Sequence, residues 1–171
     1  IRHLEKEAMA HDGVSEAQMM QQAGEDALEA LIDHWPQAEK IAVVCGAGNN
    51  AGDGFVLACL AHVRGYSVTC YLTCALDDVK KGPAYEAAVL CQEAGVSMRR
   101  WSDGLTIDAD VLVDALLGIG LDGAVRDEYA AIIEALNALT LPMISLDVPS
   151  GLNADTGEVM GVAIKAEKTI T

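Results

Sequence analysis

Apolar residues occur along this chain in two alternating patterns, as short compact runs and as longer stretches with helical spacing. The compact runs predict strands at residues 40–45, 67–72, 97–100, 111–115 and 143–147. The stretches between them predict helices at 52–64, 83–93 and 127–139, with Gly65, Pro83 and Gly95 at natural helix boundaries. Strands that alternate with helices through short links form a mostly parallel sheet with right-handed crossovers.

The two ends of the chain add further elements to this pattern. Residues 4–34 carry apolar positions at helical spacing, interrupted near Gly13, and Ser15 is a candidate N-cap. We therefore expect two N-terminal helices joined by a turn. The last residues, AEKTIT, look like the start of another strand, and the first residue is Ile. We expect residues 1–171 to form a single α/β domain truncated at both ends.

Composition limits the classes of partner. Hydrophobic residues make up 51% of the chain and aromatic residues 4%, so aliphatic side chains fill the core, as in a parallel sheet covered on both faces. The net charge is −15, which repels nucleic acid and anionic membrane surfaces, and we expect neither as a partner. With no basic patch, backbone amides and helix N-termini are expected to bind any phosphate groups.

Cysteine usage indicates the compartment. The chain has five cysteines, an odd number, and most lie within apolar segments, so they are interpreted as buried free thiols in a reducing cytoplasm. No CxxC pair or His/Cys cluster indicates a zinc site. We find no signal peptide and no apolar run long enough to span a membrane.

Three glycine-rich polar segments each follow a predicted strand directly. They are GAGNNAGDG at 46–54, DALLGIGLDG at 114–123 and DVPSGLNADTG at 147–157. In a parallel sheet all three lie at the carboxyl edge. With the common strand order 3-2-1-4-5, the first and fourth strands flank the switch point at which ligands bind. We therefore expect the three loops to line one pocket.

The first loop also matches the dinucleotide fingerprint G-x-G-x-x-G/A, which is weak evidence alone. A standard dehydrogenase places an acidic residue after its second strand, and here that strand ends at Tyr71, Leu72 and Thr73. The fingerprint does not require Asn49, Asn50 or Asp53. These side chains suggest that the loop binds more than a pyrophosphate.

The second and third loops each begin with an aspartate at the end of an apolar strand. Asp114 or Asp147 alone is best explained as a turn cap, but the two together, beside polar glycine loops, indicate a functional site. Ser150 is not in a G-x-S-x-G motif and no histidine follows it, which argues against a hydrolase triad.

Taken together and in this order, GNNAGDG, DALLGIGL and DVPSGLNADTG resemble the NAD(P)H-hydrate epimerase family, of the YjeF N-terminal domain type. The resemblance implies a Rossmann-like three-layer α/β/α sandwich with a mostly parallel sheet, preceded by the two helices. It implies an isomerase that interconverts the R and S forms of hydrated NADH and NADPH (NADHX and NADPHX) in cofactor repair. Ala51 departs from the family's usual glycine, and we expect binding to survive this change.

The resemblance also implies roles for individual residues. A potassium ion (K+) would be held by Asn50, Asp114 and Ser150, whose oxygen donors suit a hard cation. Asp147 is our hypothesis for the catalytic proton carrier. The positions that match substrate-contacting segments are Asn49, Asn50, Ala51, Gly52, Asp53, Gly118, Ile119, Gly120, Leu121, Asp122, Gly123, Ala124 and Asp147.

Two statements about partners complete the expectation. We expect a homodimer, for which the N-terminal helices offer a surface, and family members can be fused to a dehydratase domain that uses ADP or ATP. The alternative function is a Rossmann-like module that binds a nucleotide or a protein without catalysis.

Overall fold

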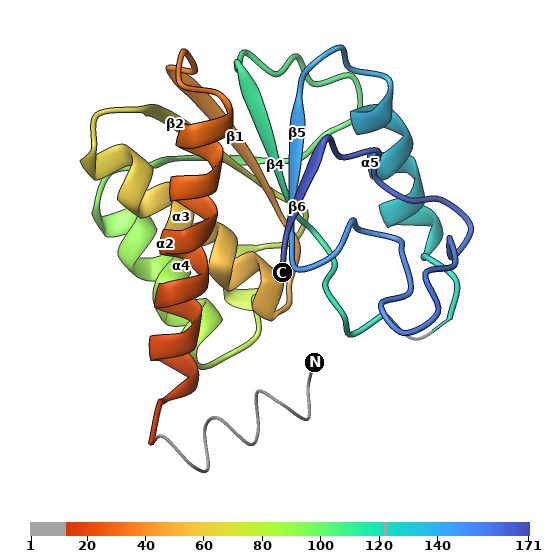
Figure 1. Cartoon of the computed structure of the whole chain (residues 1–171), viewed down its shortest axis with the longest axis horizontal. Helices are drawn as coiled ribbons and strands as arrows, with labels where there is room; N and C mark the ends of the chain where they lie inside the picture. The colour runs from red at the N-terminus through yellow and green to blue at the C-terminus, as the bar shows by residue number, and fades with distance from the viewer. Residues whose placement is uncertain (1–12, 122) are drawn as a thin grey trace.

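The computed structural model describes residues 13–121 and 123–171, and its centre is a six-stranded sheet (Figure 1). All neighbouring strands pair in parallel, in the order β3-β2-β1-β4-β5-β6. The expected order of the first five strands is confirmed, and so is a sixth strand near the end of the chain. The strands are β1 (Lys40–Cys45), β2 (Ser67–Leu72), β3 (Ser97–Arg100), β4 (Val111–Ala115), β5 (Met143–Leu146) and β6 (Lys168–Ile170).

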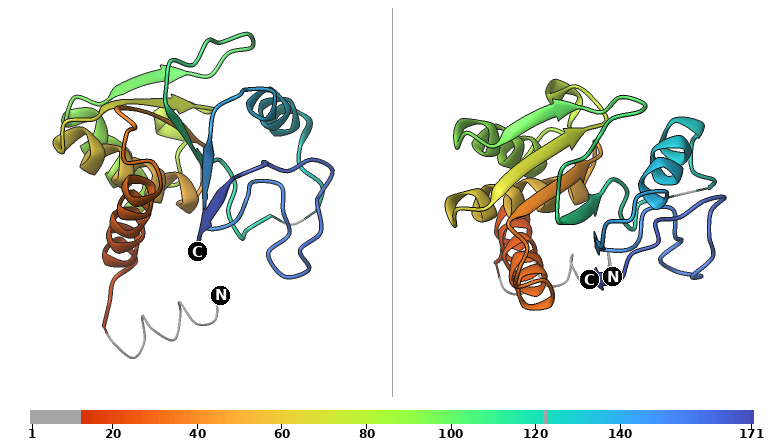
Figure 2. Two further views of the ribbon diagram at one scale, coloured as in Figure 1. Left: turned by 45° about the horizontal axis from the view of Figure 1, so that its top comes forward. Right: turned by 90° about the horizontal axis from the view of Figure 1, so that it is seen from above.

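Helices cover both faces of this sheet (Figures 1 and 2). One face carries α2 (Glu16–His34), α3 (Asn49–Val63) and α4 (Pro83–Glu93), and the other carries α5 (Asp127–Asn137). A short 3-10 helix, η1 (Leu76–Asp78), follows β2. None of the described helices is both long and apolar enough to cross a membrane.

Alternate residues of the central strand explain why both faces are covered. Ile41 and Val43 of β1 pack into the core cluster beneath α2, α3 and α4, whereas Ala42 and Val44 pack into the cluster beneath α5. All four side chains are buried, as expected for a strand between two helical layers. The three-layer α/β/α sandwich is therefore confirmed.

The N-terminal helix α2 begins where the sequence predicts. The Ser15 hydroxyl accepts a hydrogen bond from the Gln18 backbone N–H, and the Gln18 side chain accepts one from the Ser15 N–H, which completes a capping box. The other expected N-terminal helix falls within residues 1–12, outside the described residues.

Helix α3 begins at Asn49, three residues before the predicted start, so part of the first glycine loop is helical. Its first turn is wedged between two other helices. A Cβ atom on Gly52 would lie 2.5 Å from the Met20 sulfur of α2 and 2.9 Å from Ala84 Cα of α4. The spacing of Asn and Gly residues favours a loop there, but packing between α2 and α4 stabilises a helical turn. Helix α5 ends at Asn137, two residues before the predicted residue 139.

Strand β5 ends at Leu146, one residue before the predicted end, because the backbone of Asp147 turns out of the extended conformation. Asp147 has φ +67°, and among the described residues it is the only one other than glycine with positive φ. Such a conformation costs about 1–3 kcal/mol and is concentrated at functional sites.

The five cysteines are free thiols, as predicted. Cys45, Cys70 and Cys91 are buried, and Cys59 and Cys74 are half-buried. Burial raises the pKa of the Cys59 and Cys74 thiols above the ordinary value, which reduces the fraction of reactive thiolate.

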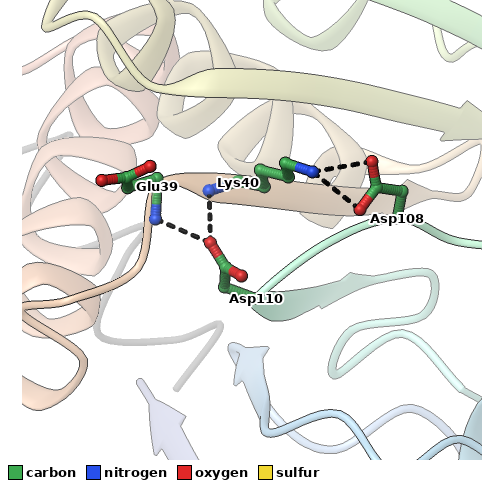
Figure 3. Close-up of polar contacts among 4 residues, drawn as sticks. All are labelled: Glu39, Lys40, Asp108 and Asp110. Atoms are coloured by element: carbon green, nitrogen blue, oxygen red, sulfur yellow. Dashed lines mark hydrogen bonds and ion pairs between the residues drawn. The ribbon is translucent and has the colours of Figure 1, made fainter.

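At the amino edge of the sheet, an exposed cluster of charges joins the starts of β1 and β4 (Figure 3). The Asp110 carboxylate accepts hydrogen bonds from the backbone N–H groups of Glu39 and Lys40, both at 2.8 Å. The Lys40 ammonium forms an ion pair with Asp108 at 2.8 Å. The carboxylates of Asp108 and Asp110 are thus both bonded within the chain.

Candidate functional site

A large cleft opens at the carboxyl edge of the sheet, bounded by α2, the start of α3, the segment after β4 and the ends of β5 and β6. Its volume is about 1650 Å³. The first two glycine segments and the first residue of the third line this one cleft. The predicted site residues among its lining are Asn49, Asn50, Asp53, Gly118, Ile119, Gly120, Leu121, Ala124 and Asp147.

Asp114 lies beneath this lining, fully buried near the end of β4. It pairs in register with Ser145 of β5, and the Ser145 hydroxyl donates to Asp114 Oδ2 at 2.8 Å. Ser150 donates twice, from its N–H to Oδ2 at 2.9 Å and from its hydroxyl to Oδ1 at 2.5 Å. Burial raises the pKa of Asp114 above the ordinary value, and the hydrogen bonds from Ser150, Ser145 and the Leu116 N–H oppose that rise.

Leu117 links Ser150 to Asn50. Its N–H donates to Ser150 Oγ at 2.9 Å, and its carbonyl accepts from Asn50 Nδ2 at 2.9 Å. The Ser150 hydroxyl also lies 3.1 Å from the Leu117 carbonyl oxygen, but its single proton serves only one acceptor at a time. The Ser150 hydroxyl can therefore donate to Asp114 Oδ1 or to the Leu117 carbonyl oxygen, but not to both at once.

The amide oxygen of Asn50 is exceptional in this cluster. Asn50 is 6% exposed, and in the described part of the chain its Oδ1 is a buried side-chain polar atom with no hydrogen-bond partner. Such an atom normally costs about 1–3 kcal/mol. One carboxylate, one amide oxygen and one hydroxyl suit a hard cation of low charge. Within residues 13–121 and 123–171, no three His, Cys, Asp or Glu side chains come together as a site for a metal ion.

Asp147 presents its carboxylate to the cleft and is held at several points. Its Oδ2 accepts the Ile119 N–H at 2.8 Å, its own N–H donates to the Ile170 carbonyl at 2.7 Å, and its carbonyl accepts the Thr171 hydroxyl at 3.1 Å. Gly118 lies between Asp147 and Asn50: a Cβ there would be 2.5 Å from Asp147 Oδ2 and 3.2 Å from Asn50 Cβ. The absent side chain at Gly118 lets the carboxylate approach the Ile119 N–H.

The side chain of Asn49 is used within the rim of the cleft. Its Nδ2 donates to Glu16 Oε1 at 2.8 Å, and its Oδ1 accepts from the Lys80 ammonium at 2.8 Å. This network joins the starts of α2 and α3 to the segment after η1. In this arrangement the Asn49 side chain stabilises the rim, and Asn49 is the first residue of α3, whose N-cap Gly48 supplies no side-chain hydrogen bond.

Not every expected site residue lies on the cleft surface. Ala51 is fully buried in the core cluster beneath α2, α3 and α4, so its methyl group does not narrow the cleft. Gly52 is buried between helices, and Gly123 is exposed outside the cleft lining. Asp122 falls outside the described residues.

The sequence interpretation missed several residues that line the cleft. Glu16, Lys80 and Thr171 lie far from the glycine segments in sequence, and nothing in the local pattern marks them. Arg126 and Tyr129 could have been found, because they follow the second glycine segment directly, at the start of α5.

Comparisons with known proteins identify the family of this chain. A family model described as YjeF-related protein N-terminus matches residues 16–171. The chain is 45% identical to the bifunctional NAD(P)H-hydrate repair enzyme Nnr of Coxiella burnetii, across 100% of this chain and 35% of that protein. It is 40% identical to the NAD(P)H-hydrate epimerase of Limosilactobacillus fermentum, across 93% of this chain and 76% of that protein. The chain thus spans about a third of the bifunctional relative and about three quarters of the epimerase.

A solved structure supports the fold independently. The yeast protein YNL200c matches 98% of this chain and 75% of its own, with a TM-score of 0.84 at 23% sequence identity. At that identity the likeness concerns the fold.

Proposed function

The chain belongs to the YjeF-related protein N-terminus family, and on this premise we propose that it is an epimerase that interconverts the R and S forms of NADHX and NADPHX. Relatives at 45% and 40% identity are named for NAD(P)H-hydrate repair and epimerisation. The observation that carries the proposal is the position of Asp147. Its carboxylate lines a large cleft, is held by the Ile119 N–H, and is separated by Gly118 from the buried Asn50, Asp114 and Ser150 cluster.

The proposed chemistry needs one group that passes a proton in both directions. The carbon to be epimerised carries a hydroxyl next to a ring nitrogen. Protonation of the hydroxyl breaks the C–O bond and releases water, while the nitrogen lone pair forms an iminium. Water then adds to the opposite face and returns the proton. Asp147 is proposed to give and take this proton. The alternative route, ring opening with reclosure, would need the same proton transfer.

We further propose that the donors Asn50 Oδ1, Asp114 and Ser150 Oγ hold a potassium ion. The support is that Asn50 Oδ1 has no hydrogen-bond partner among the described residues, while Leu117 links Asn50 to Ser150, whose hydroxyl is bonded to the buried Asp114 carboxylate. When bound, the ion would supply positive charge that compensates Asp114 and offsets part of the charge of the substrate's diphosphate. The protein's own contribution is to hold the three oxygen donors in place through Leu117 and Ser145.

Three further statements stay predictions. A cytoplasmic location is supported by the five free cysteines, since reduced thiols are typical of that compartment. A homodimer and a connection to an ADP- or ATP-dependent dehydratase are expected from the family resemblance. The names of the bifunctional relatives in Coxiella burnetii and Escherichia coli agree with a second activity in those proteins.

The deciding experiment starts from NADPHX enriched in the R form and follows the R-to-S ratio by chromatography, with and without the protein. We expect the protein to accelerate equilibration well beyond the buffer rate. A rate equal to that of buffer alone would refute the epimerase proposal. Nucleotide binding without acceleration would instead support the non-catalytic binding module.

A further inference from the structure

One cation on the cleft surface is left without a partner. Arg126 lines the cleft and is exposed, and among the described residues its guanidinium has no hydrogen bond or ion pair. The other cation in the lining, Lys80, is already bound to Asn49 and lies 3.8 Å from Glu16. Arg64, elsewhere on the surface, is paired with Glu29.

Hydrogen bonds on both sides of Arg126 fix its backbone. Arg126 is the N-cap of α5, and its carbonyl accepts the Ala130 N–H at 2.9 Å. The preceding residue, Val125, is buried and donates its N–H to the Met160 carbonyl at 3.0 Å. Tyr129, in the first turn of α5, lines the same cleft. The Arg126 side chain therefore extends from a fixed backbone position at the cleft.

The charge of the cleft makes this cation important for an anionic ligand. Four acidic residues also line the cleft, in a chain with a net charge of −15: Glu16, Asp26, Asp53 and Asp147. A ligand that carries phosphate groups must be attracted locally against that background. A guanidinium presents paired N–H donors that match two oxygens of one phosphate, and it stays charged at every physiological pH.

We propose that Arg126 binds a phosphate group of the dinucleotide substrate. This inference rests on the proposed function, because it takes NADHX and NADPHX as the ligands. Two phosphate sources share this chemistry. The diphosphate is present in both substrates, whereas the 2′-phosphate is present only in NADPHX.

The test compares Arg126→Gln, Arg126→Lys and a control, Arg100→Gln, in full kinetic analysis with both substrates. Arg100 is an exposed arginine of β3 outside the cleft lining, so its replacement changes the net charge equally. For R126Q we expect KM to rise roughly 10- to 100-fold and kcat to change less. A rise of this size is the loss of affinity expected when hydrogen bonds to a charged group are removed. R126K should lie between R126Q and the wild type, because it keeps the charge but loses the paired donors.

The two substrates identify the phosphate. An equal rise in KM for NADHX and NADPHX assigns Arg126 to the diphosphate, and a rise confined to NADPHX assigns it to the 2′-phosphate. Unchanged KM for both substrates, or an equal rise in R100Q, overturns the proposal.

Binding of NADP+ by isothermal titration calorimetry separates this proposal from the proposed function. If the wild type binds NADP+ without epimerising NADPHX, and R126Q weakens binding at least 10-fold while R100Q does not, Arg126 keeps its role and the epimerase proposal fails. If R126Q binds NADP+ as the wild type does, or if the wild type does not bind it, the Arg126 proposal fails.

Discussion

Strand β4 has an aspartate at each end, and the two differ in almost every physical respect. Asp110, at the amino edge, is exposed, and backbone hydrogen bonds from Glu39 and Lys40 hold its pKa below the ordinary value (Figure 3). Asp114, at the carboxyl edge, is fully buried, and burial raises its pKa. Asp110, directly before β4, and Asp114, within it, thus have pKa values shifted in opposite directions at the two sheet edges.

The difference shows how a structural carboxylate is distinguished from a site carboxylate. The amino-edge cluster is complete: Asp110 joins two strand starts, and Asp108 neutralises Lys40. The carboxyl-edge cluster differs, because Asn50 Oδ1 is buried with no hydrogen-bond partner among the described residues, and Asp114 is fully buried. A buried carboxylate is expensive to keep and is retained where a cation or a reaction requires it.

The largest expected effect contrasts one aspartate from each edge. Asp147→Asn removes the proposed proton carrier but keeps the size of the side chain, and we expect kcat for epimerisation to fall about 10²- to 10⁴-fold. Asp110→Asn, at the amino edge, should leave kcat unchanged. Initial rates of R-to-S conversion of NADPHX check both variants. A D147N enzyme with near-normal kcat would move the catalytic role to another residue.

The next effect concerns stability at the carboxyl edge. Ser150→Ala removes the hydroxyl that donates to Asp114 Oδ1 at 2.5 Å and leaves that oxygen only the Leu116 N–H at 3.2 Å. We expect the free energy of unfolding to fall by about 1.5–3 kcal/mol, measured by urea titration in potassium-free buffer. Asp108→Ala breaks an exposed ion pair instead and should leave the urea midpoint unchanged. Equal losses in the two variants would remove the distinction between the edges.

A smaller effect should come from the ion itself. Binding of K+ to the folded protein alone stabilises it by about 1.4 kcal/mol when the ion concentration is ten times Kd. We therefore expect the thermal midpoint to rise in KCl relative to choline chloride at equal ionic strength. Asn50→Leu, which removes the unpaired oxygen, should abolish the rise, and D110N should keep it. A rise that persists in N50L would place the ion elsewhere.

Much of the architecture follows from local patterns, and the features missed are those created by distant contacts. The alternation of strands and helices predicts parallel pairing with right-handed crossovers, and the expected strand order is the common 3-2-1-4-5. The early start of α3 depends on Met20 and Ala84, which approach Gly52 from other helices. The left-handed backbone of Asp147 is held by Ile119 and Ile170, which no local pattern reveals.

The candidate site divides in the same way. Asn50, Asp114 and Ser150 come together because each follows or ends a strand at one sheet edge, which the sequence predicts. The rim contacts of Asn49 were not predictable, because Glu16 and Lys80 reach it from separate segments. The net charge of −15 also gave no indication of Arg126, because a total charge does not say where a single cation lies.

The smallest effect tests the amino edge by itself. The pKa of Asp110 is lower in the folded state than in the unfolded state. Its carboxylate therefore stabilises the fold fully at pH values above the ordinary pKa of about 3.9. This stabilisation is lost as the pH falls through the folded-state pKa. The unfolding midpoint of D110N should therefore lie below that of the wild type at pH 7, and the two should converge on acidification below about pH 4. Thermal unfolding from pH 7 to pH 2 measures this. Asp103→Asn removes an exposed aspartate outside the cluster and should give a curve parallel to that of the wild type. If D110N also runs parallel to the wild type, the backbone hydrogen bonds of Figure 3 contribute nothing to acid stability.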